Sequence, residues 1–374
     1  MINNGVMPVV RKQQELMKKE GLGALVAVSP EMIRYTIGTV VPTQSLIRER
    51  LAICITSSSG KQVVIVVSIE EELVKKESFV EDVRIYNEFT DKPMKILSDV
   101  LKEMNLENEK IGIELDFLPT KHFSILSKEM PNTKFVDCKE YFLQLREIKT
   151  NEEIEIIREI GKAAEYAHNK VFKELKPGMS EKDLGSLVIS ELYARSGADP
   201  KILVVATGER SSMLNASATN RVIKDGDVIR VDIMATKKGY YCDVCRTSIV
   251  GKPSKKQLDI WNTIIEAREL VLSNIKPGVN SHEIYSIYND FVTKKGLTSI
   301  DFVGHGLGLG LHEEPYIGKY GGATFKPGMV MCVEPIHVVP SVMGFQVEDE
   351  ILITDNGYEF ITGSASSTEI PIIG

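Results

Sequence analysis

The chain has 374 residues, of which 43% are hydrophobic and 26% charged, and a formal net charge of −7. This length exceeds the size at which one hydrophobic core usually stops growing, so we expect two folded domains. The acidic balance excludes a nucleic-acid-binding surface, and the sequence contains neither a signal peptide nor about 18 consecutive apolar residues for a membrane helix, so we expect a cytoplasmic protein.

Residues 1–148 alternate between helical and strand patterns, which predicts an α/β domain. An amphipathic helix is expected at Val10–Lys19 and an apolar strand at Ala24–Val28. Two further strands, Leu51–Ile55 and Gln62–Val67, flank a polar turn and should form a hairpin. The remaining predicted elements are a helix near Met94–Met104, a strand at Ile111–Glu114 and a helix around Thr120–Lys128. This region carries no chemical motif.

The second domain, residues 149–374, begins at a helix-start signal. Thr150-Asn-Glu-Glu153 has the pattern of a capping box, in which the Thr and Glu side chains each bind a backbone N–H of the first turn. It opens a helix that should run to about Leu175. We therefore place the domain boundary just before this signal.

An internal duplication organises the second domain. Lys176-Pro-Gly178, followed by a helix cap at Ser180, recurs as Lys276-Pro-Gly278, followed by Asn280 or Ser281. In both copies, the motif follows one helix and starts another. These matching segments predict two halves related by pseudo-twofold symmetry.

The duplicated halves also place carboxylates at matching positions. The segment ending at Asp232 matches the one ending at Glu334, and each reads as a Gly turn feeding an apolar strand that ends in the acid. In each half, the chain then turns and returns as a second strand with another acid. This acid is Asp243 in the first half and Glu348 in the second. A single acid of this kind is as often a strand end that reaches solvent, but two matching pairs predict four converging carboxylates.

Four buried carboxylates would repel one another unless cations neutralised them. Between the two halves lies Gly304-His-Gly-Leu-Gly308, whose glycines should let the backbone turn tightly and present His305. An isolated His is more often structural than a ligand. One imidazole and four carboxylates nevertheless suffice for two divalent ions, and oxygen-rich ligation favours Mn²⁺, with Co²⁺, Fe²⁺ or Zn²⁺ as alternatives. Such a site suits hydrolysis by a hydroxide that bridges the metals.

Cys242 and Cys245 form a C-x-x-C pattern, which could belong to a zinc or redox site. No second C-x-x-C exists, and the segment has a strand pattern. We interpret the five cysteines, an odd and scattered set, as reduced thiols.

These residues resemble the pita-bread metallopeptidase family, which includes methionine aminopeptidase, aminopeptidase P, prolidase and the metal-free creatinase. The resemblance implies an α/β N-terminal domain, as in the prolidase, aminopeptidase P and creatinase branch, followed by an α+β pita-bread catalytic domain with internal pseudo-twofold symmetry. The segments that carry it are Val231-Asp-Ile, Gly304-His-Gly-Leu-Gly, His312-Glu-Glu-Pro315, Val333-Glu-Pro335 and Val347-Glu-Asp349.

The resemblance also implies a role for each candidate residue. Asp243 and Glu348 would bridge the two metals, and Asp232 would complete one metal site. His305 and Glu334 would complete the other, and Glu334 could shuttle a proton. His312 would bind the substrate and the tetrahedral intermediate; its structural interpretation is a polar residue beside two glutamates.

Two positions depart from the peptidase pattern. Asn215 stands where proline-specific members usually carry a His that helps to bind substrate, and an amide cannot titrate. Gln346 stands where the peptidases typically have an Arg that supports the carboxylate cluster. Both departures bear on the identity of the substrate.

The resemblance further implies a homodimer in which one subunit's N-terminal domain covers the partner's active site. Arg48 and Arg50 could then bind a substrate carboxylate, although for either Arg alone a solvated loop leading into the Leu51 strand is the more common situation. The leading hypothesis is a peptidase of the Xaa-Pro dipeptidase or aminopeptidase type acting on small peptides. The alternatives are a creatinase-like hydrolase of a small non-peptide C–N bond, such as an amide, and a catalytically silent interaction module.

Overall fold

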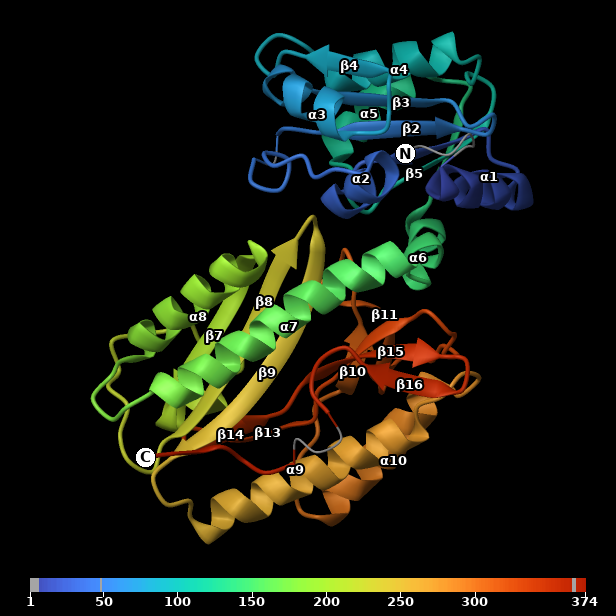
Figure 1. Ribbon diagram of the computed structural model, residues 1–374. Helices are drawn as coiled ribbons and strands as arrows, with labels where there is room; N and C mark the ends of the chain where they lie inside the picture. The colour runs from blue at the N-terminus through green and yellow to red at the C-terminus, as the bar shows by residue number, and fades with distance from the viewer. Residues whose placement is uncertain (1–6, 48, 365–367) are drawn as a thin grey trace. The chain divides into compact units, whose positions relative to one another are not determined.

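The computed structural model describes residues 7–47, 49–364 and 368–374. Internal contacts divide the chain into two compact units, residues 1–146 and 147–374, which are described separately below (Figure 1). Within the described residues, no helix combines the length and the apolar character needed to cross a bilayer.

The N-terminal unit is built on one six-stranded sheet in the order β4-β3-β2-β1-β5-β6. Strands β2 and β3 form the predicted antiparallel hairpin, in which Ile53 pairs with Ile65. Helices α4 and α5 pack apolar side chains such as Leu97 and Leu126 against one face of the sheet. The strands are β1 Ala24–Ala27, β2 Ile53–Ser57, β3 Gln62–Val67, β4 Val83–Tyr86, β5 Lys110–Ile113 and β6 Lys134–Asp137. The helices are α1 Pro8–Glu20, α2 Pro30–Ile37, α3 Glu71–Glu77, α4 Pro93–Glu103, α5 Thr120–Glu129 and α6 Lys139–Glu147, with a 3₁₀ turn, η1, at Ser68–Glu70.

The C-terminal unit contains two larger sheets and a hairpin. The sheet orders are β17-β9-β8-β7 and β11-β10-β12-β15-β16, and β13 pairs with β14. The helices are α7 Asn151–Glu174, α8 Glu181–Ser196, α9 Lys255–Asn274 and α10 Ser281–Lys294, with a 3₁₀ turn, η2, at Gly208–Ser212. The strands are β7 Asp199–Thr207, β8 Val228–Lys237, β9 Tyr240–Val250, β10 Phe302–Gly306, β11 Glu313–Gly318, β12 Val330–Val333, β13 Ile336–Val339, β14 Met343–Gln346, β15 Asp349–Thr354, β16 Gly357–Phe360 and β17 Ile372–Ile373.

The helix-start signals of this unit are confirmed. Thr150 and Glu153 form a complete capping box at the start of α7. Ser180 caps α8, and Asn280, rather than Ser281, caps α10. Each cap supplies a side-chain acceptor to a first-turn N–H that would otherwise lack a partner.

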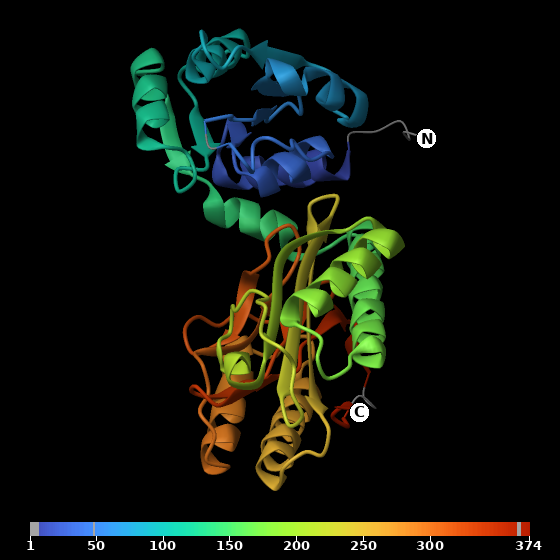
Figure 2. The same cartoon turned by 90° about the vertical axis from the view of Figure 1, so that its left-hand side faces the viewer.

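The two halves of the C-terminal unit repeat a helix pair followed by antiparallel strands. Helices α7 and α8 lie against the sheet of β7, β8 and β9 (Figure 1). Helices α9 and α10 lie side by side in both views (Figure 2) and contribute Ala267, Val271, Ile284 and Tyr288 to a core shared with β10, β12 and β15. This layering buries one face of each sheet and turns the strands of both halves toward each other.

One detail of the predicted repeat is wrong. Asp232 does not end its strand, because β8 continues to Lys237, whereas Glu334 does follow the last residue of β12 directly. The longer first strand is possible because β8 pairs along its whole length with β9, which leaves no unpaired backbone to terminate it.

Candidate metal centre

Asp232 and Asp243 are brought together by the pairing of β8 with β9. In this register Asp232 lies opposite Cys245, and Met234 lies opposite Asp243. Paired residues share a face of the sheet, and side chains alternate between the two faces along a strand. Asp243 lies two residues from Cys245, the partner of Asp232, and so shares the face of Asp232. The two aspartates therefore point to the same side of the sheet.

The second half of the unit contributes His305, Glu334 and Glu348. His305 lies on β10 opposite Cys332 of β12, Glu334 follows β12, and Glu348 falls between β14 and β15. The backbone N–H of Glu348 donates to the Cys245 carbonyl of β9 at 3.1 Å. This bond links the second half directly to the strand that carries Asp243.

Short distances show that these side chains meet. His305 Nε2 lies 3.2 Å from Glu334 Oε1 and 3.8 Å from Glu348 Oε1. It also lies 3.8 Å from Asp243 Oδ2. Single ligand atoms of Asp232, Asp243 and Glu348 lie within 4.8 Å of one another. The structure thus gathers all five predicted residues into one cluster.

Burial makes this cluster electrostatically unfavourable without a cation. Burial raises the pKa of Asp232 to about 6, and Glu334 adds to the effect while Arg230 opposes it. Burial, followed by the neighbouring carboxylates, raises the pKa values of Asp243 and Glu348 well above their ordinary range. Without a cation, Asp243 and Glu348 would hold protons rather than charge.

Each of the five side chains also has a buried atom without a hydrogen-bond partner among the described residues. These atoms are Asp232 Oδ1, Asp243 Oδ1, His305 Nε2, Glu334 Oε1 and Glu348 Oε1. Buried polar atoms are almost always satisfied, so five orphans in one place indicate an absent ligand. Their oxygen-rich chemistry fits divalent cations.

The tautomer of His305 is compatible with metal binding. Its Nδ1 lies 2.9 Å from the Gly306 carbonyl oxygen, which can only accept a hydrogen bond. Nδ1 therefore carries the proton, and the lone pair of Nε2 is left facing the carboxylates.

The glycines beside His305 do not form the tight turn that the sequence predicted. Neither Gly304 nor Gly306 has a positive φ, and both lie on the paired strand β10. A Cβ at Gly304 would collide with the Cys332 carbonyl oxygen, and one at Gly306 would lie 2.7 Å from the Glu314 carbonyl oxygen. Glycine is needed because neighbouring backbone approaches closely.

Cys332 is a neighbour that the sequence analysis did not identify. Its sulfur, a His305 nitrogen and a Glu348 oxygen lie within 4.8 Å of one another. Burial and then the surrounding carboxylates raise the pKa of the Cys332 thiol well above its usual value. Because oxygen-rich ligation favours harder metals than thiolate does, we assign Cys332 no ligand role.

His312 lies beside the cluster in an aromatic group. Its ring stacks on that of His305 with centroids 3.8 Å apart, and it makes an edge contact with Phe302. Tyr316 Oη lies 3.3 Å from His312 Nδ1. Burial and the nearby His305 lower the pKa of His312 to about 4, so its imidazole is neutral at physiological pH. Tyr316 follows the predicted motif by one residue, and its role was not apparent from the sequence.

The other predicted substrate residues lie in less informative positions. Asn215 is exposed, in the turn that follows η2. Arg50 places Nε and Nη2 on the two carboxylate oxygens of Glu88, both at 2.8 Å, so its fork already has a partner in the N-terminal unit. Arg48 lies outside the described residues. Substrate binding by these three residues stays a prediction.

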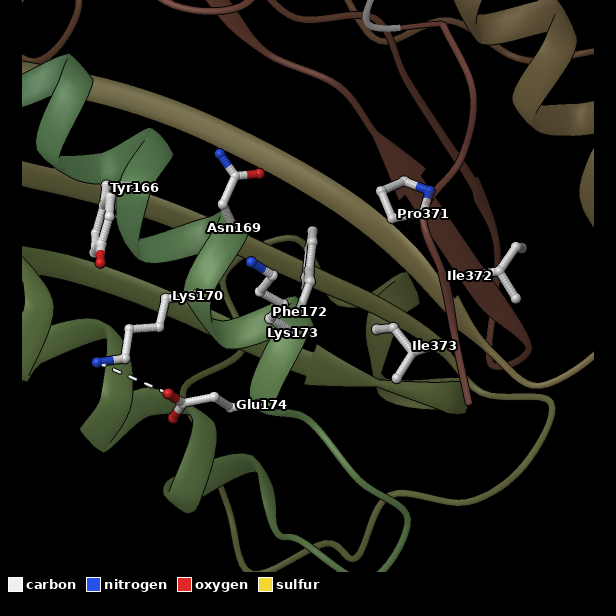
Figure 3. Close-up of a pocket in the computed structure, with 9 residues that line it drawn as sticks. All are labelled: Tyr166, Asn169, Lys170, Phe172, Lys173, Glu174, Pro371, Ile372 and Ile373. Atoms are coloured by element: carbon white, nitrogen blue, oxygen red, sulfur yellow. Dashed lines mark ion pairs between the residues drawn. The ribbon is translucent and has the colours of Figure 1, made fainter.

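A surface hollow elsewhere in the C-terminal unit is separate from the cluster. It lies between the end of α7 and the C-terminal residues, where Lys170 pairs with Glu174 (Figure 3). Its lining residues are Tyr166, Asn169, Lys170, Phe172, Lys173, Glu174, Pro371, Ile372 and Ile373. None of them belongs to the candidate centre.

Comparisons with known proteins match both units of the chain. The family model for the Creatinase/Prolidase N-terminal domain matches residues 10–148, and the model for Metallopeptidase family M24 matches residues 155–355. A peptidase of Bacillus subtilis, YqhT, is 34% identical over 68% of this chain and 73% of its own. An Xaa-Pro dipeptidase of Pyrococcus furiosus is 33% identical over 71% of this chain and 76% of its own. The solved Xaa-Pro dipeptidase from Bacillus anthracis has a TM-score of 0.86 and 25% identity, and the match covers 99% of this chain and 100% of that one.

Proposed function

The chain belongs to metallopeptidase family M24, as a metal-dependent peptidase with a creatinase/prolidase N-terminal domain and a pita-bread catalytic domain, and we propose that it hydrolyses Xaa-Pro peptides. The observation that carries this proposal is the convergence of five buried, unpartnered donor atoms. They belong to Asp232, Asp243, His305, Glu334 and Glu348. The Xaa-Pro dipeptidases among the similar proteins support the choice of substrate.

We propose that these residues hold two divalent ions. Asp243 and Glu348 would bridge the ions, Asp232 would complete one site, and His305 with Glu334 would complete the other. One imidazole among four carboxylates favours Mn²⁺, with Co²⁺, Fe²⁺ and Zn²⁺ as alternatives. When bound, the ions would lower the pKa of water and polarise a carbonyl oxygen.

The protein's own residues divide the remaining tasks. Glu334 is the most exposed of the five candidates, at 7%, which suits a carboxylate that exchanges a proton with substrate or water. If the Tyr316 hydroxyl donates to Nδ1 of the neutral His312, the other nitrogen, Nε2, carries the proton. His312 can then donate to the oxygen that gains charge as the peptide carbonyl is attacked.

A substrate survey tests this proposal. Protein reconstituted with Mn²⁺ is incubated with Xaa-Pro dipeptides, longer Xaa-Pro peptides, other dipeptides and small guanidino or cyclic amides, and products are identified by mass spectrometry. We expect cleavage before proline, and no cleavage by the Glu348→Gln variant. Cleavage of the other compounds alone would reject the Xaa-Pro assignment.

A second candidate function is hydrolysis of a small non-peptide C–N bond. Asn215 and Gln346, which replace the His and Arg typical of the peptidases, favour it. The retention of all five candidate ligands argues against a metal-free activity or a silent interaction module.

The family resemblance also implies a homodimer, and we propose this state for the active enzyme. Light scattering coupled to size-exclusion chromatography measures it directly. A fully active monomer at the assay concentration would reject it.

A further inference from the structure

Arg230 is a charged residue in the apolar run of β8, and its side chain is completely buried. All three guanidinium nitrogens make contacts, and Nε donates to the Ser211 carbonyl oxygen at 3.3 Å. Nη1 donates to Gln346 Oε1 at 2.8 Å, and Nη1 also lies 3.6 Å from Asp232 Oδ2. Nη2 donates to the carbonyl oxygens of Met213 and Leu214 at 2.7 and 2.6 Å. A buried guanidinium is tolerated only where such acceptors surround it.

Gln346 connects this arginine to the candidate metal ligands. Because a guanidinium can only donate, the amide oxygen of Gln346 faces Arg230, which turns the amide nitrogen toward the carboxylates. That nitrogen lies 3.1 Å from Glu348 Oε2 and 3.4 Å from Glu334 Oε2. One amide therefore links Arg230 to two candidate ligands.

We propose that Arg230 is a positioning residue that supplies, from β8, the positive charge behind the candidate ligands, to Asp232 directly and to Glu334 and Glu348 through Gln346. Gln346 accepts a hydrogen bond from Arg230, and its amide nitrogen lies near Glu334 and Glu348, so this neutral side chain connects the arginine to both carboxylates. Arg230 itself lies close to Asp232. The inference rests on the proposed function, since it concerns how the chain prepares its carboxylates for metal.

Arg230 is connected to both positions that depart from the family pattern, to Gln346 directly and to Asn215 through the two residues that precede it. Its contacts to Met213 and Leu214 hold the turn that presents Asn215, and its contact to Gln346 reaches the metal ligands. The altered substrate position and the altered supporting position are thus connected through one side chain. A change in the charge arrangement behind the candidate ligands would therefore also affect the turn that carries Asn215.

Relocating the charge tests this proposal. The variants are Arg230→Met, Gln346→Arg and the double variant Arg230→Met/Gln346→Arg, with Arg221→Met as a control. Arg221 pairs with Glu209 and Asp227 in the same unit, away from the candidate ligands. Mn²⁺ affinity is measured by calorimetry on the metal-stripped full-length protein, without substrate, so the readout does not depend on the substrate assignment.

Removing a group that supports a metal ligand typically weakens metal binding about 10–100-fold, and we expect this loss in Arg230→Met. The double variant should recover to within about threefold of wild type, because the charge returns from position 346. A double variant as weak as Arg230→Met, or an Arg230→Met variant with wild-type affinity, would overturn the proposal. Absence of any Mn²⁺ binding in the wild-type protein would instead reject the proposed function.

Arg230→Lys provides a second test that survives if Arg230→Met fails to fold. Lysine keeps the charge and a donor for Gln346, but without a planar fork it cannot also bind the turn. We expect Mn²⁺ affinity within about threefold of wild type together with a KM raised more than kcat is lowered, since the turn near the substrate is loosened. A tenfold loss of Mn²⁺ affinity in this variant would show that charge is not what Arg230 supplies.

Discussion

The metal-free protein should lose stability as the pH rises, because Asp232 holds its proton more tightly when folded. Its pKa is raised from an ordinary value of 3.8 to about 6. Between these values, the folded state binds more protons than the unfolded state, so the stabilising effect is complete below pH 4 and is lost as the pH passes 6. A pKa of about 6 in place of 3.8 corresponds to about 3 kcal/mol of stability, and most of this is lost between pH 4 and pH 7.

Urea denaturation of chelator-treated protein at several pH values measures this loss. The Asp232→Asn variant should lack the contribution, so its free energy of unfolding should fall about 2–3 kcal/mol less than that of wild type between pH 4 and pH 7. Asp199→Asn, which changes an exposed acid at the start of β7, serves as the matched control. Mn²⁺ should flatten the wild-type profile by stabilising the carboxylate. Parallel profiles for wild type and Asp232→Asn would refute the reasoning.

Three further variants probe the surroundings of the cluster. His312→Ala should lower kcat about 10²–10³-fold while metal content stays constant, since an oxyanion donor is lost; an unchanged kcat would remove His312 from the site. Asn215→His should change the ranking of substrates by kcat/KM, and an unaltered ranking and pH profile would place this residue outside the substrate site. Lys149→Met should destabilise the fold by about 3–5 kcal/mol in urea denaturation, because it removes the buried cation that lies 2.9 Å from the buried Glu313 carboxylate; a loss below about 1 kcal/mol would contradict this account.

The sequence predicted features that depend on local chemistry. The capping box at Thr150 and the hairpin at Gln62–Val67 follow from short-range patterns, and both are present. The four candidate carboxylates were identified because the duplication repeats acids at matching positions, and His305 was identified within its glycine-rich segment. The structure brings all five residues together.

Features that depend on which segments meet in space were missed. Arg230 was visible as a charge inside an apolar strand, but its partners Gln346 and Leu214 are known only once β8, β14 and the turn are packed. The reason for Gly304 was also misjudged, because the close carbonyl belongs to a strand far along the sequence. Similarly, nothing near Arg50 in the sequence indicates that Glu88 binds its fork.

The most direct test of the account is a titration of metal-stripped protein with Mn²⁺, followed by the rate of hydrolysis of an Xaa-Pro dipeptide. We predict no hydrolysis without metal, a rise in rate that saturates as two ions bind each chain, and no comparable rise in Asp243→Asn, which lacks a bridging carboxylate. Full activity in the metal-free protein, or two tightly bound ions in Asp243→Asn, would contradict the account.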